Sequence, residues 1–192
     1  MTQEIPEAAR AIQSLTENTR LVLVTGHRRE SHGQGFENIC NAIRNVADKI
    51  ADINFIYPVH LNPKVQEPVN RILGNHPRIH LVDPLSYEPF VWLLNQCDIV
   101  LTDSGGVQEE APSFGKPVLV MRDTTERPEG VEAGNAKLVG TCQETIETEL
   151  IRLLTDPAAY AEMADAQNPY GDGTASRQIA DVLASQAVST KS

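Results

Sequence analysis

The chain has few cysteines and lacks the motifs of disulfide-rich and zinc-binding proteins. Its 192 residues include three cysteines, Cys40, Cys97 and Cys142, which are far apart and odd in number. A disulfide framework needs paired cysteines, and a structural zinc site needs motifs such as Cys-x-x-Cys, which do not occur. We therefore expect no disulfide and no metal ion, and we interpret the cysteines as small buried apolar residues.

Positive charge and long apolar segments are also scarce. Lys and Arg number 16 against 26 Asp and Glu, which gives a net charge of −10 at pH 7. This excess of acid disfavours nucleic acid and anionic membranes as partners, because both bind basic surfaces. No apolar run reaches about 18 residues, and the N-terminus lacks the basic and apolar regions of a signal peptide. The composition therefore predicts a soluble, cytoplasmic protein.

Two common nucleotide-binding motifs are missing as well. No Gly-Lys-Ser/Thr loop occurs, and Gly33-Gln34-Gly35 lacks the third glycine of the dinucleotide fingerprint. Kinase and hydride-transfer functions therefore have little support, and we expect no cofactor.

Short apolar runs alternate with segments of helical periodicity. The runs are apolar almost throughout, which is typical of parallel strands covered on both faces. Strands are predicted at residues 21–25, 54–59, 79–82, 99–102, 117–121 and 136–139. Helices are predicted at residues 36–50, 65–73, 87–95, 107–114, 144–154, 157–166 and 176–185.

This alternation predicts an α/β domain over residues 20–188, with a Rossmann-like parallel six-stranded sheet and helices on both faces. Residues 1–19 are interpreted as a helical remnant or linker. Gly74 and Gly115 each follow a predicted helix and are expected to end it, as glycines commonly do.

The most distinctive segment is TDSGGVQEE, residues 102–110, which follows an apolar run and opens a helix. Gly105 and Gly106 let a ligand approach the backbone, and Ser104 adds a hydroxyl suited to helix capping or to a phosphate oxygen. Glu110 cannot bind a phosphate, but it could accept hydrogen bonds from a ribose diol, as acidic residues do in dinucleotide folds. The segment therefore predicts an anion site beside a ribose.

Histidines follow two of the predicted strands, at the sheet edge where open parallel sheets bind ligands. His27 could be structural, a general acid or base, or a phosphate contact, and the neighbouring Arg28 and Arg29 favour phosphate contact. His60 lies between two prolines, which favours a structural role in a tight turn.

Two further residues near this edge allow two interpretations each. Arg127 could clamp a phosphate or form an exposed ion pair with Glu126 or Glu129. Phe90 lies on a short predicted helix, where core packing is the default and stacking on a nucleobase is the alternative.

Six motifs stand in order along the chain. They are TGHRRES (25–31), YPVHLNP (57–63), TDSGGVQEEAP (102–112), GKPV (115–118), RDTTERPE (122–129) and NPYGDG (168–173). Together they closely resemble the C-terminal half of bacterial non-hydrolysing UDP-N-acetylglucosamine 2-epimerases. The resemblance implies the second of two Rossmann-like domains that enclose a UDP-sugar in a glycosyltransferase-B-like architecture.

The resemblance also implies how the diphosphate is held. Ser104, Gly105 and Gly106 would bind it, and Arg127 would contact a phosphate or the sugar region. His27 would contact the diphosphate close to the reacting sugar, as the catalytic residue of this half.

The remaining implied contacts concern the nucleoside and a second ligand. Glu110 would bind the ribose hydroxyls, and Phe90 would lie near the uracil. Leu85 replaces a glutamine of the relatives, so the base contact there would rest on backbone. Arg28 and His60 match positions associated with a second, activating UDP-sugar.

The implied reaction interconverts UDP-N-acetylglucosamine and UDP-N-acetylmannosamine by elimination and re-addition of UDP. The acid–base carboxylates of the family lie in the N-terminal domain, which also forms most of the family's dimer contact and which we expect to be missing here. The chain alone should then bind UDP weakly and epimerise little. Two alternatives stay open: a non-catalytic UDP-sugar-binding module and the donor-binding half of a glycosyltransferase.

Overall fold

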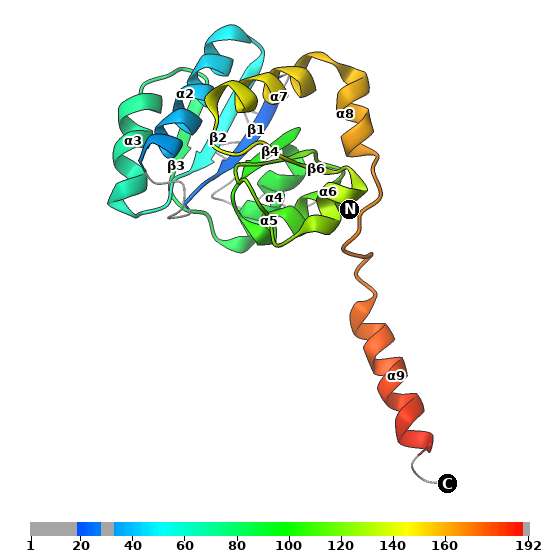
Figure 1. Ribbon diagram of the computed structural model, residues 1–192. Helices are drawn as coiled ribbons and strands as arrows, with labels where there is room; N and C mark the ends of the chain where they lie inside the picture. The colour runs from blue at the N-terminus through cyan, green and yellow to red at the C-terminus, as the bar shows by residue number, and fades with distance from the viewer. Residues whose placement is uncertain (1–18, 28–32, 190–192) are drawn as a thin grey trace.

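The computed structural model describes residues 19–27 and 33–189, and in this part of the chain six strands form one parallel sheet. The strands are β1 (Arg20–Thr25), β2 (Ile53–Pro58), β3 (Ile79–Val82), β4 (Ile99–Thr102), β5 (Val118–Val120) and β6 (Ala136–Leu138). Their order across the sheet is β3-β2-β1-β4-β5-β6, and neighbouring strands are parallel (Figure 1). This is the strand order of the Rossmann fold, so the predicted fold class is confirmed.

The sheet is buried on both faces because its strands alternate between two apolar layers. On β1, Val22 and Val24 pack into one layer, and Leu21 and Leu23 pack into the other. All four side chains are at most 1% exposed. Successive strand residues point to opposite faces, so a strand that is apolar throughout must be covered twice.

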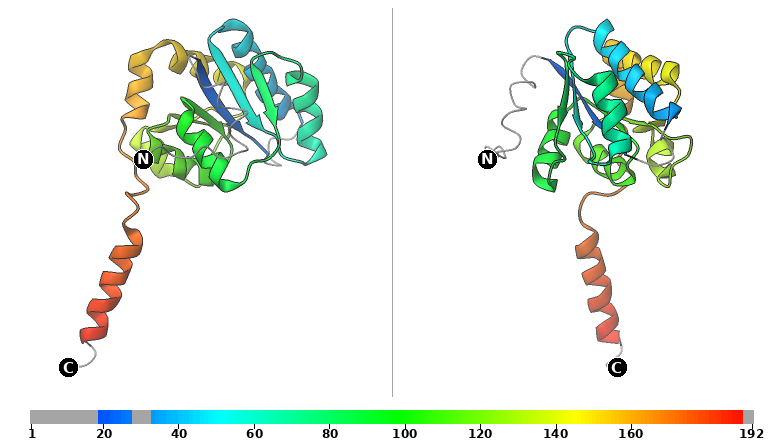
Figure 2. Two further views of the ribbon diagram at one scale, coloured as in Figure 1. Left: turned by 180° about the vertical axis from the view of Figure 1, so that it is seen from behind. Right: turned by 90° about the vertical axis from the view of Figure 1, so that its left-hand side faces the viewer.

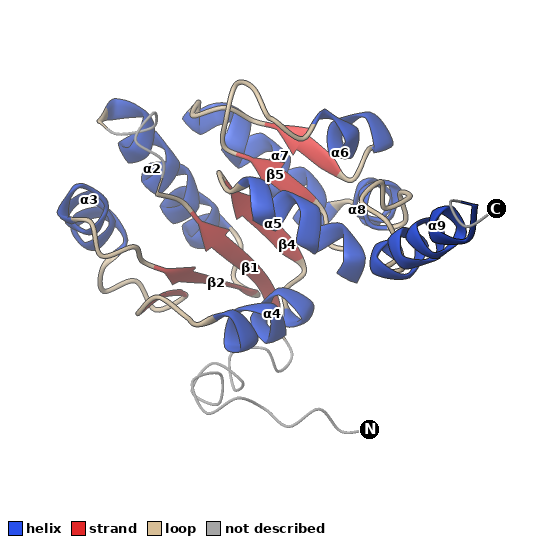
Figure 3. Ribbon diagram, turned by 90° about the horizontal axis from the view of Figure 1, so that it is seen from below, coloured by secondary structure: helices blue, strands red, loops and turns tan. Residues whose placement is uncertain are grey.

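Helices cover the two faces in separate groups, as the end-on view in Figure 3 shows. One layer contains side chains of α2 (Gln34–Lys49), α3 (Pro63–Leu73), α7 (Gln143–Thr155) and α8 (Pro157–Ala164). The other contains side chains of α4 (Tyr87–Gln96), α5 (Gly105–Glu110), the 3-10 turn Ala111–Phe114 and α6 (Pro128–Ala133). The six-residue α6 was not predicted, because it is too short to show helical periodicity.

The last helix, α9 (Ala175–Ser189), stands away from the rest of the domain (Figures 1 and 2). Its side chains are exposed from residue 175 to residue 185, including Ile179, Val182 and Leu183. The helix itself was predicted, although its separation from the body was not. The helix or linker predicted for residues 1–19 lies almost wholly outside the described residues.

Both glycines predicted to end helices do so, but in different conformations. Gly115 has a left-handed φ of 63°, whereas Gly74 has φ −58° and ψ 147°. The left-handed residue after α3 is Asn75, with φ 62°. Gly74 is needed for a different reason, because a Cβ there would lie 2.3 Å from the backbone oxygen of Asn70.

Gly74→Ala should therefore destabilise the chain by about 1–3 kcal/mol through overpacking against backbone. Asn75→Gly should be neutral or stabilising by about 0.3 kcal/mol, because glycine adopts the positive φ of this position without steric strain. Urea unfolding of both variants checks the contrast. Equal stabilities of Gly74→Ala and the parent chain would contradict the steric explanation.

Candidate functional site

The candidate site lies where β1 and β4 end beside each other. These strands pair in parallel with Thr25 opposite Thr102. The chain runs from β1 to β2 on one side of this pair and from β4 to β5 on the other side. In open α/β sheets the crevice at this switch point, outside the carboxyl ends of the strands, is where ligands bind. His27 lies two residues after β1 and Asp103 directly after β4, and these two polar residues meet here.

Short polar contacts join the two strand ends. The Thr25 and Thr102 hydroxyl oxygens lie 2.5 Å apart, and the backbone N–H of Asp103 donates to the Thr25 carbonyl at 3.1 Å. The Tyr57 hydroxyl donates to the Gly26 carbonyl at 2.7 Å, and burial raises the pKa of this phenol well above its usual value. The turn after β1 is therefore fixed from both neighbouring strands.

The segment after β4 leaves its backbone open to a ligand. The Ser104 N–H donates to the Thr102 hydroxyl at 2.9 Å, and Ser104 precedes the first residue of α5. Among described atoms, a Cβ on Gly105 would come no nearer than 4.0 Å to Arg127, and a Cβ on Gly106 no nearer than 4.0 Å to Ser104. Side chains therefore leave room beside both glycines, and the anion site predicted at this turn stays a prediction.

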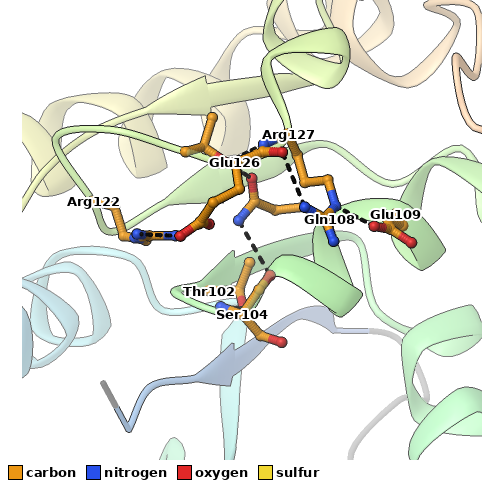
Figure 4. Close-up of polar contacts among 8 residues, drawn as sticks. Thr102, Ser104, Gln108, Glu109, Arg122, Glu126 and Arg127 are labelled. Carbon is orange, nitrogen blue, oxygen red and sulfur yellow. Dashed lines mark hydrogen bonds and ion pairs between the residues drawn. The ribbon is translucent and has the colours of Figure 1, made fainter. Parts of the chain in front are cut away.

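A polar network ties α5 to the loop after β5 (Figure 4). The buried Gln108 side chain accepts from the Thr125 hydroxyl at 2.6 Å and donates to the Ser104 carbonyl at 3.2 Å. The Thr125 hydroxyl in turn accepts from the Arg127 N–H at 3.0 Å. Gln108 therefore sets the distance between the glycine turn and Arg127, a role that sequence analysis missed because Gln108 reads as an ordinary helix residue.

Two arginines of the RDTTERPE segment are held by carboxylates. Arg127 pairs through Nε with Glu109, and the hydrogen bond and charge of Glu109 raise the pKa of its guanidinium. Arg122 pairs with Glu126 at 2.5 and 3.0 Å. An ion pair of Arg127 was predicted as an alternative, but its partner is Glu109 rather than Glu126 or Glu129.

Glu110 lies one position beyond that pair and is partly buried. Burial, followed by the charge of Glu109, raises the pKa of its carboxyl. Glu109 is occupied by Arg127, so the two adjacent carboxylates have different surroundings.

The rings of His27 and His60 lie side by side, a contact that was not predicted. The two imidazoles stack with centroids 5.3 Å apart and planes 11° from parallel. The structural role predicted for His60 is also present, since its Nδ1 accepts the Asn62 N–H at 3.1 Å. Phe90 and Leu85 pack against the layer beneath α4. Arg28 lies outside the described residues.

The cysteines and histidines form no metal cluster in the described part of the chain. His76 and His80 are four residues apart but lie before and within β3, where they contact Asp48 and Asn54.

Cys40 and Cys97 are buried, as predicted, and burial raises the pKa of each thiol to about 12. The prediction for Cys142 is wrong. It is exposed before α7, and hydrogen bonds involving Thr145 lower its pKa.

The structure defines a Rossmann-like α/β domain with a glycine turn at its switch point, where domains of this class bind their ligands. A protein-family model described as UDP-N-acetylglucosamine 2-epimerase matches residues 1–184, and the chain belongs to this family.

Individual members of this family are similar to the chain in sequence. The chain is 58% identical over 170 residues to the UDP-N-acetylglucosamine 2-epimerase of Escherichia coli (strain K12), covering 88% of this chain and 45% of that protein. It is 52% identical over 164 residues to the Bacillus subtilis (strain 168) enzyme, covering 85% and 43%. The chain thus spans about half the length of these relatives and corresponds to their C-terminal half.

Solved structures agree. The Neisseria meningitidis UDP-GlcNAc 2-epimerase bound to UDP-GlcNAc superposes with a TM-score of 0.88 at 45% identity, covering 93% of this chain and 48% of that one. The C-terminal domain of a Francisella tularensis group 1 glycosyl transferase superposes at 0.62 with 17% identity, which shows a shared fold. The predicted glycosyltransferase-B-like fold is therefore confirmed. Among the helices described, none is long and apolar enough to cross a membrane.

The pKa of Glu110 yields a pH-dependent prediction. A raised pKa means that folding disfavours the charged carboxylate, so ionisation of Glu110 lowers stability above its ordinary pKa. Glu110→Gln should raise the free energy of unfolding at pH 7, by less than about 1 kcal/mol because solvent screens a partly exposed group. The gain should shrink as the pH falls through the raised pKa and vanish below the ordinary pKa. Urea unfolding between pH 7 and pH 4 measures it, and a gain that stays constant would contradict this explanation.

Proposed function

We propose that this chain is the UDP-binding half of a UDP-N-acetylglucosamine 2-epimerase, which interconverts UDP-N-acetylglucosamine and UDP-N-acetylmannosamine. The observation that carries the proposal is the open glycine turn at the β1–β4 switch point, in a chain 45% identical to a relative bound to UDP-GlcNAc. Sequence family and site position therefore point to the same ligand.

The diphosphate is proposed to lie over the hydroxyl of Ser104 and the backbone of Gly105 and Gly106. Backbone N–H groups suit a chain with a net charge of −10, because they supply positive dipoles where basic side chains are few. Arg127 would add a charge-assisted contact. Its pairing with Glu109 holds the guanidinium about 4 Å from the position a Gly105 Cβ would occupy, so it already lies beside the turn.

The nucleoside is proposed to lie beyond the diphosphate. Glu110 would accept hydrogen bonds from the ribose hydroxyls, and Phe90 would lie near the uracil. Glu110 suits the first role because Glu109, rather than Glu110, is the partner of Arg127. Arg28 and His60 are proposed to contact a second UDP-sugar that activates the enzyme.

The reaction is proposed to proceed by elimination of UDP and its re-addition. C2 of the sugar is not next to a carbonyl group, so its proton is weakly acidic and direct removal would be slow. Loss of UDP breaks the C1–O bond as the C2 proton leaves, giving a 2-acetamidoglucal. Re-addition of UDP at C1 with protonation of C2 from the opposite face completes the epimerisation.

This half would stabilise the departing UDP, with His27 beside the diphosphate close to the sugar. The acid and base that act at C2 are proposed to be carboxylates of the N-terminal half of the enzyme. That half is also the proposed partner domain and the main dimer contact, and the cytoplasm is the proposed location. The isolated chain should accordingly turn over poorly.

Isothermal calorimetry with UDP tests the binding half directly. The chain should bind UDP weakly, and Glu110→Ala should weaken binding by about tenfold or more, as expected for the loss of hydrogen bonds to a charged group. Glu162→Ala provides a matched control, because Glu162 is an exposed carboxylate on α8. No heat from any of the three proteins would refute the proposed function, and equal affinities would refute the role of Glu110.

A further inference from the structure

Asp103 is a buried carboxylate that faces both the backbone and the ring of a single residue. It is 1% exposed and follows β4 directly. Its Oδ2 accepts the His27 backbone N–H at 2.8 Å, and its Oδ1 lies 3.6 Å from His27 Nδ1. One carboxylate therefore contacts both the backbone N–H of His27 and the ring nitrogen, Nδ1, that turns inward.

The position of this carboxylate bears on which nitrogen of His27 carries the proton when the ring is neutral. An ionised carboxylate can only accept hydrogen bonds, so a nitrogen that faces it is suited to be a donor. That arrangement would put the hydrogen on Nδ1 and leave the lone pair on Nε2. A histidine in water has no such constraint. The 3.6 Å separation is long for a hydrogen bond, and contacts of this kind tighten when a ligand closes the site.

His60 is constrained in the opposite sense. Its Nδ1 accepts the Asn62 N–H, so a neutral His60 must carry its hydrogen on Nε2. The two rings stack within 11° of parallel. His60 thus covers one face of the His27 ring while Asp103 holds its edge.

The backbone around this arrangement has little freedom. The Thr25–Thr102 contact and the Tyr57 hydrogen bond to the Gly26 carbonyl fix the strand ends from which Asp103 and His27 emerge. A Cβ on Gly26 would lie 3.1 Å from the Tyr57 hydroxyl, so this turn is closely packed. The His27 side chain, in contrast, is 48% exposed, which leaves the ring accessible from the site.

We propose that Asp103 is a positioning residue that holds neutral His27 in the Nδ1–H tautomer, and that the stacked His60 adopts the Nε2–H tautomer. The pair then presents one lone pair and one N–H, at the Nε2 atoms of two adjacent rings. The functional meaning rests on the proposed contact of His27 with the diphosphate near the reacting sugar. There Asp103 would fix which nitrogen can accept or return a proton, as the buried carboxylate does in carboxylate–histidine pairs of other enzymes.

Nitrogen-15 NMR of the histidine rings in the whole chain tests this assignment. At about pH 9 imidazoles are neutral, and pyrrole-type and pyridine-type nitrogens have well separated shifts. Wild-type His27 should show a pyrrole-type Nδ1, and His60 should show a pyrrole-type Nε2. Single substitutions of the histidines assign the signals.

Asp103→Asn should reverse the His27 tautomer. The amide oxygen can still accept the His27 backbone N–H, which turns the amide N–H toward Nδ1 and makes that nitrogen the acceptor. Asp83→Asn is the matched control, because Asp83 is an exposed carboxylate just after β3 at the same sheet edge. This control should leave both tautomers unchanged.

The outcomes separate clearly. A pyridine-type Nδ1 on wild-type His27, or an unchanged tautomer in a folded Asp103→Asn chain, would overturn the proposal. If Asp103→Asn does not fold, the wild-type spectrum decides by itself, with His60 as the internal reference. A chain that shows the expected tautomers but gives no heat with UDP would refute the proposed function and leave the positioning role standing.

Discussion

The pairing of β1 with β4 is the constraint on which the site depends. These strands are far apart in sequence, yet the register places Thr25 opposite Thr102, so the residues after each strand share one crevice. Burial of β1 on both faces holds the strand in the middle of the sheet, between β2 and β4. A shift of one residue would exchange the two faces and separate His27 from Asp103.

The proposed anionic ligand is compatible with an acidic chain, because the positive groups at the site are local and already oriented. Backbone N–H groups at the glycine turn carry no net charge, so they do not change the overall balance of the protein. Glu109 and Glu126 hold Arg127 and Arg122, which lowers the entropy lost when an arginine is fixed against a ligand. Gln108 connects these features, since it contacts both the Ser104 carbonyl and Thr125.

Most of the fold, but only part of the site, could be predicted from the sequence. Strands that are apolar throughout signal their own burial, and the observed bounds lie close to those predicted. Local patterns were less reliable for single residues: Gly74 ends α3 without the left-handed φ that Gly115 has, and Cys142, expected to be buried, is exposed just before α7. The Glu109–Arg127 and His27–His60 contacts join separate segments, so no spacing rule could predict either pair. The motifs predicted that these residues lie at the carboxyl edge of the sheet, but which side chains contact each other is seen only in the structure.

The proposed role of this chain is that of the UDP-binding half of a divided catalytic site. The most direct test mixes the chain with a separately produced N-terminal half of a relative, such as the Escherichia coli enzyme, and follows conversion of UDP-N-acetylglucosamine to UDP-N-acetylmannosamine. We expect slow or no conversion by either half and restored conversion by the mixture, which His27→Asn should reduce. Conversion at ordinary enzyme rates by the chain alone, or a mixture in which the halves associate but remain inactive, would contradict it.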